Sequence, residues 1–304
     1  MFRFALRAVA LSGVAISLTG CSIKRMAINS LGTAVASGST STFARDEDAE
    51  LIRDAVPFAL KTIESLIEES PNHRGLLTAA ASGFTQYGYA FVQQDADFIE
   101  AKDLEKATQM RLRAKKLYLR AADYGLRGLE TGLPGFRSQF ATDPDAALAK
   151  ASKKDVSLLY WTGAAWAAAL AVDVNDSDLA VRQTSIEKMM HRALALDEGF
   201  AQGALHDFFI SWEAAHAGTG GSIAKAREHF AAATRLSKGL RAAPFVALAE
   251  SVAINENNRK EFETLLQQAL AIDIEKTPDQ KLANVISQRR ARWLLARVDD
   301  LFVN

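Results

Sequence analysis

The strongest constraint in this 304-residue sequence is a helical periodicity that takes over near residue 46. Apolar side chains recur at spacings of three and four residues, which places them on one face of an α-helix. In the first such segment they are Leu51, Ile52, Ala55, Phe58, Ala59, Ile63, Leu66 and Ile67. The Val/Ile/Thr alternation of half-buried strands is nearly absent. The pattern predicts an all-α fold of about a dozen helices without a sheet.

A shorter pattern recurs inside these segments: Ala, three residues, an aromatic ring, two residues, Ala. Its copies are Ala114/Tyr118/Ala121 and Ala226/Phe230/Ala233, with looser ones at Ile186/Met190/Ala193, Phe262/Leu266/Ala269 and Ala59/Ile63/Leu66. From position 114 onward they lie about one or two units of 36 residues apart. The pattern resembles the second helix of a tetratricopeptide unit and predicts a stack of divergent repeats with a concave binding face. The alternative is an unrelated helical bundle.

The final helical segment, residues 281–302, also has an apolar face. Its apolar residues at helical spacing are Leu282, Val285, Ile286, Trp293, Leu294 and Val298. Because a repeat stack exposes an apolar edge at its end, we expect this segment to act as a capping C-terminal helix. The alternative is that it contacts a partner subunit.

The N-terminus reads as a processing signal rather than as part of the fold. Arg3 and Arg7 precede an apolar run, residues 8–18, that is too short to span a bilayer. Residues 18–21, Leu-Thr-Gly-Cys, resemble the lipobox of bacterial lipoproteins, and Cys21 is the sole cysteine. We therefore expect a signal peptide at 1–20, lipidated Cys21 with a flexible Ser/Thr-rich tether at 21–45, and a helical domain at 46–304. Cys21 buried in an ordinary helix is the alternative.

Lipidation of Cys21 would anchor the protein to a membrane without spanning it. Ser22 follows the cysteine, whereas Asp at that position would resemble a signal for retention in the inner membrane. We therefore expect the protein on the periplasmic face of the outer membrane.

Composition and motifs argue against several functions. The 36 Lys and Arg balance the 36 Asp and Glu, which argues against covering nucleic-acid phosphates with a basic face. The five histidines are dispersed, and His206 and Asp207, although adjacent, point about 100° apart on a helix. The glycine-rich residues 218–222 lack the strand and the Lys of a phosphate-binding loop. We predict no enzyme activity, no metal site and no cofactor.

Three aromatic clusters carry more information. The candidates for a ligand-lined pore or pocket are Tyr87, Tyr89, Phe91, Trp161, Trp166, Phe208 and Trp212. Gly83, Gly88 and Gly163 lie beside them, which indicates close helix contacts or room for a ligand. Core packing is the alternative for each cluster, since Tyr and Trp have an apolar body and a polar tip that suit either role.

Several stretches, taken in order, resemble a known family. They include KRMAINSLG, ELIRDAVPFALKTIESLIEESP, GLLTAAASGFTQYGYAFVQ, RAKKLYLRAADYGLRGLE, LLYWTGAAWAAAL, GALHDFFISWEAA and LANVISQRRARWLLARVDDLF. The family is the T-component (TatT) lipoproteins of tripartite ATP-independent periplasmic (TRAP) transporters. The resemblance implies hidden tetratricopeptide-like repeats, a trimer with a pore through each protomer, and no catalytic residues. It also implies a partner, the periplasmic solute-binding (P) subunit, and a hydrophobic or carboxylate-bearing ligand.

Two functional hypotheses follow. In the first, a membrane-anchored accessory protein docks the solute-binding subunit and binds or conducts the ligand. In the second, a tetratricopeptide-like scaffold binds other envelope proteins during assembly and has no small-molecule ligand.

Overall fold

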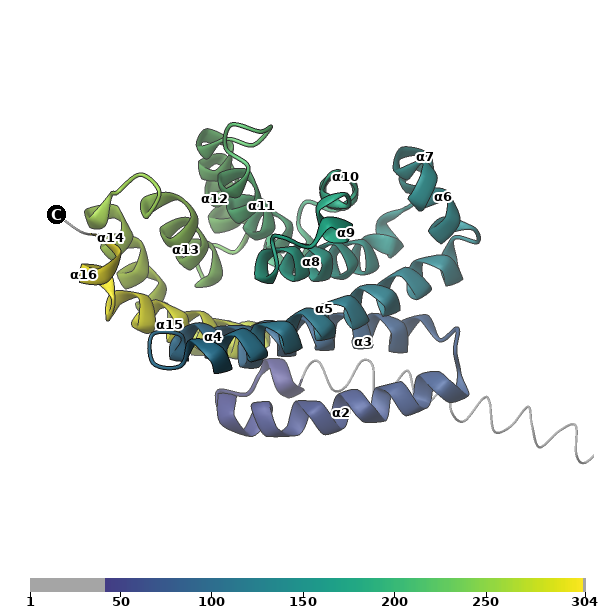
Figure 1. Ribbon diagram of the computed structural model, residues 1–304, viewed down its shortest axis with the longest axis horizontal. Coiled ribbons are helices and arrows are strands. Elements are labelled where there is room, and N and C mark those ends of the chain that lie inside the picture. Colours follow the sequence, from purple (N-terminus) through teal and green to yellow (C-terminus); the bar gives the residue numbers. More distant parts are fainter. Residues whose placement is uncertain (1–41, 303–304) are drawn as a thin grey trace, which may run out of the picture.

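The computed structural model describes residues 42–302, which are helical apart from turns and one isolated bridge between Ala217 and Gly221. The expected all-α class is confirmed (Figure 1). The first helices are α2 (Ala49–Glu69), α3 (Arg74–Tyr87), α4 (Gln94–Ile99), α5 (Leu104–Gly132), α6 (Phe136–Thr142) and α7 (Pro144–Ala149). The later ones are α8 (Val156–Val172), α9 (Ser177–Ala180), α10 (Gln183–Leu196), α11 (Ala204–Ala215), α12 (Ile223–Leu236), α13 (Ala243–Leu248), α14 (Arg259–Leu270), α15 (Lys281–Leu295) and α16 (Val298–Leu301).

The long helix α5 organises the N-terminal half. It packs against α3 on one side and α8 on the other, while α2 packs on the outer side of α3. Figure 1 shows α5 running across the molecule between α2 and the arc of later helices. The segment Lys153–Val172, which ends with α8, is long and apolar enough to cross a membrane, but half of it is buried inside the protein. The apolar character of α8 is therefore explained by its place in the core.

Successive helices of the arc pack in pairs: α8 with α10, α11 with α12, and α13 with α14. Three copies of the sequence pattern lie in these pairs, on α10, α12 and α14, and two lie on α2 and α5; most of their residues are buried. Those with no exposed surface are Ala114, Tyr118, Ala121, Ile186, Met190, Ala193, Ala226, Ala233, Phe262, Leu266 and Ala269. The alternation of small and large buried residues thus reflects close helix packing. That the pairs are diverged tetratricopeptide units stays a prediction from the sequence.

Helix α15 joins the C-terminal end of the arc to the N-terminal helices. It packs on α13 and α14, as a capping helix would, but it also contacts α2. The rings of Trp293 in α15 and Phe98 in α4 lie 5.2 Å apart between centroids. The last long helix therefore closes the C-terminal core onto the N-terminal helices, and Figure 1 shows α15 beside α4.

Two π-helical turns interrupt the helices near this closure. The turn η1 (Gly88–Gln93) lies between α3 and α4, and η4 (Ala249–Ala253) follows α13. A π-turn widens the helix by one residue and re-aims the side chains beyond it, and such turns are frequent at functional sites.

The crossing of α5 over α8 depends on Gly125. A Cβ atom added there would overlap the Thr162 hydroxyl and lie 3.1 Å from Thr162 Cβ. Thr162 is fully buried, and its hydroxyl donates to the Leu158 carbonyl at 2.6 Å. This contact therefore has no room for a residue larger than glycine unless one of the two helices moves.

We expect Gly125→Ala to destabilise the protein by up to about 2 kcal/mol, because overpacking costs roughly 1–3 kcal/mol and the gain in helix propensity returns only about 1 kcal/mol. Urea unfolding measures the loss, and adding Thr162→Ala should restore part of it. Gly199→Ala is the matched control, since its added Cβ would meet only Asp197 Oδ1 at 3.8 Å. A Gly125→Ala variant as stable as Gly199→Ala would contradict this account.

Candidate functional site

The structure separates the seven aromatic candidates into two groups. Each member of the first group is at most 9% exposed and lies in the core: Tyr87, Phe91, Trp166 and Trp212. The second group keeps accessible surface: Tyr89 is 44% exposed, and Trp161 and Phe208 are half-buried. The lipidation candidate, Cys21, lies outside the described residues. The fold therefore divides the aromatic candidates between the core and the accessible surface.

Tyr89, in η1, stands beside an ionic junction made by three elements. Arg290 of α15 donates to Asp97 Oδ2 of α4 at 2.7 Å and to Glu250 Oε1 of η4 at 2.7 Å. The Arg290 side chain is only 13% exposed, and its guanidinium lies 4.5 Å from the Trp293 ring centroid. Although Tyr89 is 44% exposed as a whole, its hydroxyl end is buried, and this burial and the Glu250 carboxylate raise the pKa of the hydroxyl, which therefore stays protonated.

A second buried ion pair lies on α11. Asp207 Oδ2 is 2.6 Å from Arg241 Nη2, and both side chains are largely buried. The other oxygen, Asp207 Oδ1, is buried without a hydrogen-bond partner among the described residues. Burial raises the pKa of Asp207 although Arg241 opposes it. Burial and the nearby Asp207 carboxylate also raise the pKa of Tyr160, on α8, to about 12.

These two groups are connected along one path. Ser211 lies one turn after Asp207 on α11, and its hydroxyl accepts from Ser251 Oγ of η4 at 3.1 Å. Ser251 follows Glu250, which pairs with Arg290. We call the connected residues the interior surface: Tyr89, Tyr160, Asp207, Ser211, Glu250, Ser251 and Arg290.

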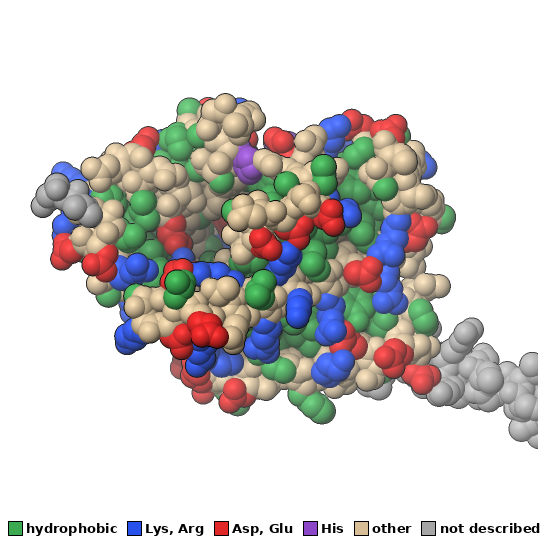
Figure 2. Space-filling view, in the orientation of Figure 1, with side chains coloured by type: hydrophobic (Ala, Val, Ile, Leu, Met, Phe, Trp, Pro, Cys, Tyr) green, Lys and Arg blue, Asp and Glu red, His purple; other side chains and the backbone are tan. Residues whose placement is uncertain are grey.

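The interior surface belongs to the helices around a hollow in the molecule. Figure 2 shows the hollow between the α11–α14 side and the side formed by α4 and α15, with acidic and basic side chains inside it. Aromatic rings flank the polar path, since the Tyr160 ring lies 4.8 Å from that of Trp161 and 5.2 Å from that of Phe200. Such a surface combines apolar walls with a few placed polar groups, as ligand sites do.

The chemistry of this surface favours binding. Its arginines and acids are paired with one another, so the groups that would activate a nucleophile or move a proton are engaged in ion pairs. Over residues 42–302, no group of three or more His, Cys, Asp or Glu side chains is placed to hold a metal ion.

Two comparisons with known proteins place the chain in a family. Residues 45–302 match the protein family described as TRAP transporter T-component. The chain belongs to the TRAP transporter T-component family. It is also 34% identical over 303 residues to an uncharacterised protein of Treponema pallidum (strain Nichols), and the alignment covers 94% of each chain. The resemblance found in the sequence is confirmed, and with it an association with TRAP transport. T-components are accessory proteins of a transporter and not a family of enzymes.

Histidines that are dispersed along this T-component chain come together in the fold. His206 Nδ1 of α11 lies 2.8 Å from His229 Nδ1 of α12, so one nitrogen donates to the other. Glu198 Oε1 is 3.3 Å from His206 Nε2, and the Phe209 ring stacks between those of His229 and His191. Burial, and then the nearby His206 imidazole, lower the pKa of His229 to about 4, while burial lowers that of His206. The pair is therefore neutral at pH 7.

His206 and Asp207 confirm that neighbours on a helix need not share a site. His206 faces His229 on α12, whereas Asp207 faces Arg241. Sequence reasoning missed the partners Arg241 and Arg290, because no spacing along the chain relates them to Asp207 or Asp97. The one sequence feature that could have pointed to Arg290 is the adjacent pair Arg289–Arg290 in the last long helical segment. Adjacent arginines are too common in helices to indicate a site.

We expect acid to weaken folding through the histidine pair. Both rings have a pKa below the unfolded value of roughly 6.5, so the unfolded state binds more protons and stability falls as the pH drops from about 7 towards 4. His229→Gln should reduce the slope between pH 7.5 and 5.5 by up to about 1.4 kcal/mol per pH unit. Urea unfolding at several pH values measures it, with His191→Gln as the control. An unchanged slope in His229→Gln would contradict the assignment.

Proposed function

We propose that this protein is a membrane-anchored accessory component of a TRAP transport system that docks the solute-binding (P) subunit. In this proposal it also binds or conducts a hydrophobic or carboxylate-bearing ligand along the interior surface. The family match, which spans residues 45–302, carries the proposal. The matched region includes both ion-paired groups and the three accessible rings, so the family relationship extends over the whole interior surface.

The proposed anchor is lipidated Cys21. The lipobox-like residues before it and the Ser/Thr-rich segment after it support this assignment. A tether of about 25 residues would hold the helical domain close to the periplasmic face of the membrane, and Ser22 favours the outer membrane.

The proposed ligand path uses the accessible rings rather than the buried ones. Tyr89, Trp161 and Phe208 supply apolar contact, while the two ion pairs supply polar groups without a net positive charge. This combination supports a ligand with a substantial apolar body, because a free carboxylate would have to compete with Asp207 or Glu250 for an arginine.

Self-association is part of the same proposal. Phe58 is 79% exposed and Leu51 lies two turns earlier on the same face of α2. Large apolar side chains gathered on one exposed face favour a contact with another copy of the chain, which agrees with the trimer that the family resemblance implies. The paired helices α8/α10, α11/α12 and α13/α14 support the assignment to diverged tetratricopeptide-like repeats.

Capture of the partner tests docking and anchoring together. A C-terminally tagged full-length protein is extracted with mild detergent from membranes of its own organism, and bound proteins are identified by mass spectrometry. We expect a periplasmic solute-binding protein to be enriched at least tenfold over an unrelated lipoprotein. Cys21→Ser should move the tagged protein to the soluble fraction. A bait that enriches only envelope-assembly factors would favour the scaffold hypothesis instead.

Retention of a ligand tests the interior surface. Organic-solvent extracts of the purified protein should contain a bound lipid or organic acid. Trp161→Ala or Phe208→Ala should reduce the bound amount about tenfold, equivalent to a loss of ~1.4 kcal/mol. Leu104→Ala serves as the control, since it removes an exposed apolar side chain that has no part in the proposed path. If Trp161→Ala and Phe208→Ala retain as much ligand as Leu104→Ala, the rings do not line the path.

A further inference from the structure

Three arginines form a regular stripe along α5. Arg113, Arg120 and Arg127 are seven residues apart, which is close to two helical turns and places them on one face. Each guanidinium lies over an aromatic ring, with carbon-to-centroid distances of 5.9 Å to Tyr87, 5.3 Å to Phe84 and 5.3 Å to Tyr124 for Arg113, Arg120 and Arg127 respectively. We call these three residues the arginine stripe.

Two of the three arginines in the stripe, Arg113 and Arg127, carry positive charge that no described carboxylate neutralises. Arg113 and Arg127 have no carboxylate within 4 Å in the described part of the chain, and the exposed Lys116 between them has none either. Arg120 is 50% exposed and lies 3.6 Å from Glu64. That carboxylate already accepts from Lys61 at 2.6 Å and from the Tyr124 hydroxyl at 2.7 Å.

Several arginines elsewhere on the molecule bind acids closely. Arg111, Arg227 and Arg290 each bind two carboxylates at hydrogen-bond distance. Arg113 and Arg127 differ from these three residues, because each guanidinium lies over an aromatic ring and is not paired with an acid. The rings below limit the rotation of each guanidinium and leave its N–H edges outward, so the stripe is pre-organised to meet carboxylates.

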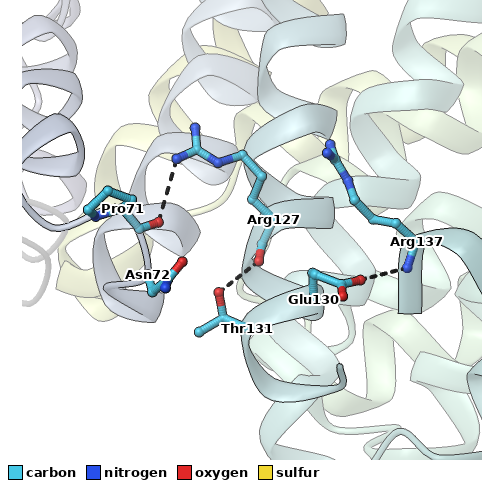
Figure 3. A pocket seen from close by; sticks show the side chains of 6 residues that line it. All are labelled: Pro71, Asn72, Arg127, Glu130, Thr131 and Arg137. Carbon is cyan, nitrogen blue, oxygen red and sulfur yellow. Dashed lines mark hydrogen bonds between the residues drawn. The ribbon is translucent and has the colours of Figure 1, made fainter. Parts of the chain in front are cut away.

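A shallow depression of about 390 Å³ continues the stripe at its C-terminal end. Figure 3 shows Arg127 of α5 and Arg137 of α6 extending on either side of it, with Asn72 from the α2–α3 turn and Thr131 below. Glu130 also borders the depression, but its carboxylate accepts from the backbone N–H groups of Gly135 at 2.7 Å and Arg137 at 2.8 Å. Arg127 itself makes only a 3.5 Å contact to the Pro71 carbonyl, which leaves its N–H groups free for an incoming oxygen.

We propose that the arginine stripe and this depression form the docking surface for an acidic face of a partner protein. The inference rests on the proposed function, in that the partner is taken to be the solute-binding subunit. Figure 2 shows Lys and Arg side chains, interspersed with Asp and Glu, in the region of α5.

The surroundings of the stripe favour a protein over an anionic membrane. Leu112 is 51% exposed beside Arg113, and Leu119 precedes Arg120, so apolar contacts are offered between the charges as in protein interfaces. The neighbouring helix α2 exposes acidic side chains, Glu50, Asp54 and Glu68, which an anionic bilayer would repel. The arginine stripe is only one helix wide, so it fits a narrow row of carboxylates on a protein better than the flat surface of a membrane.

Charge reversal tests the docking surface. The full-length protein in detergent is compared with the triple variant Arg113→Glu/Arg120→Glu/Arg127→Glu for binding to the captured, purified solute-binding protein. We expect at least about 30-fold weaker binding, and wild-type affinity that falls as NaCl rises from 50 to 300 mM. The control Lys102→Glu/Lys260→Glu/Lys276→Glu makes the same change of charge at exposed positions elsewhere and should bind within about threefold of wild type. A second triple variant, with Gln at the three stripe positions, removes the positive charge without reversing it. Circular dichroism of both triple variants checks that they are folded.

The outcomes separate the two proposals. If the wild type binds a solute-binding protein and the stripe variants bind it equally well, the docking surface is wrong while the proposed function stands. If the wild type binds no solute-binding protein, the proposed function fails as well. Stripe-dependent binding to phosphatidylglycerol vesicles without protein binding would replace the partner with a membrane. A smaller oligomer in the stripe variants, measured by light scattering, would reassign the surface to contacts between copies.

Discussion

The architecture depends on one buried cation, Arg290, and the two carboxylates it joins. Asp97 belongs to the N-terminal half and Glu250 to the C-terminal arc, so a single guanidinium on α15 ties together segments that are far apart in sequence. Hydrophobic burial has no direction and would permit α15 to slide along its neighbours. A buried ion pair fixes the register, because displacement would strand a charge at a cost of roughly 3–5 kcal/mol. The turn η1 leads into α4, which carries Asp97, and the turn η4 contains Glu250, so a π-helical turn lies close in sequence to each acid.

The helices and the family could be predicted from the sequence because both signals are local. The three-and-four periodicity reports which face of each helix is buried, and the ordered stretches report common ancestry. The polar groups of the site could not be predicted in the same way. Asp207 finds Arg241, and His206 finds His229, only after α11 has packed against its neighbours. Such pairings depend on how the helices pack, and the spacing of residues along one sequence does not show which residues the packing brings together.

The aromatic clusters show why rings that are near one another in the sequence separate in the fold. Trp161 and Trp166 are five residues apart, which separates their directions by about 140° on a helix. Trp166 therefore enters the core, where its ring lies 6.1 Å from that of Phe140, while Trp161 keeps accessible surface beside Tyr160. Tyr87 and Tyr89 diverge for the same reason, at about 160°. Four of the seven candidate rings serve the fold, which leaves Tyr89, Trp161 and Phe208 available for a ligand.

Inside and outside, this protein distributes its charges differently. Around the hollow, Arg241 and Arg290 are each neutralised by acids, so the field there is weak and short-ranged. Along α5, Arg113 and Arg127 lie on aromatic rings instead of beside acids, and their field extends into solvent over roughly a Debye length of 8–10 Å. Attracting a charged partner from a distance requires charges that are not neutralised, whereas holding an apolar ligand requires a surface on which charges are neutralised. A protein that receives a partner on one surface and an apolar ligand on another can meet both demands only by keeping the two surfaces separate.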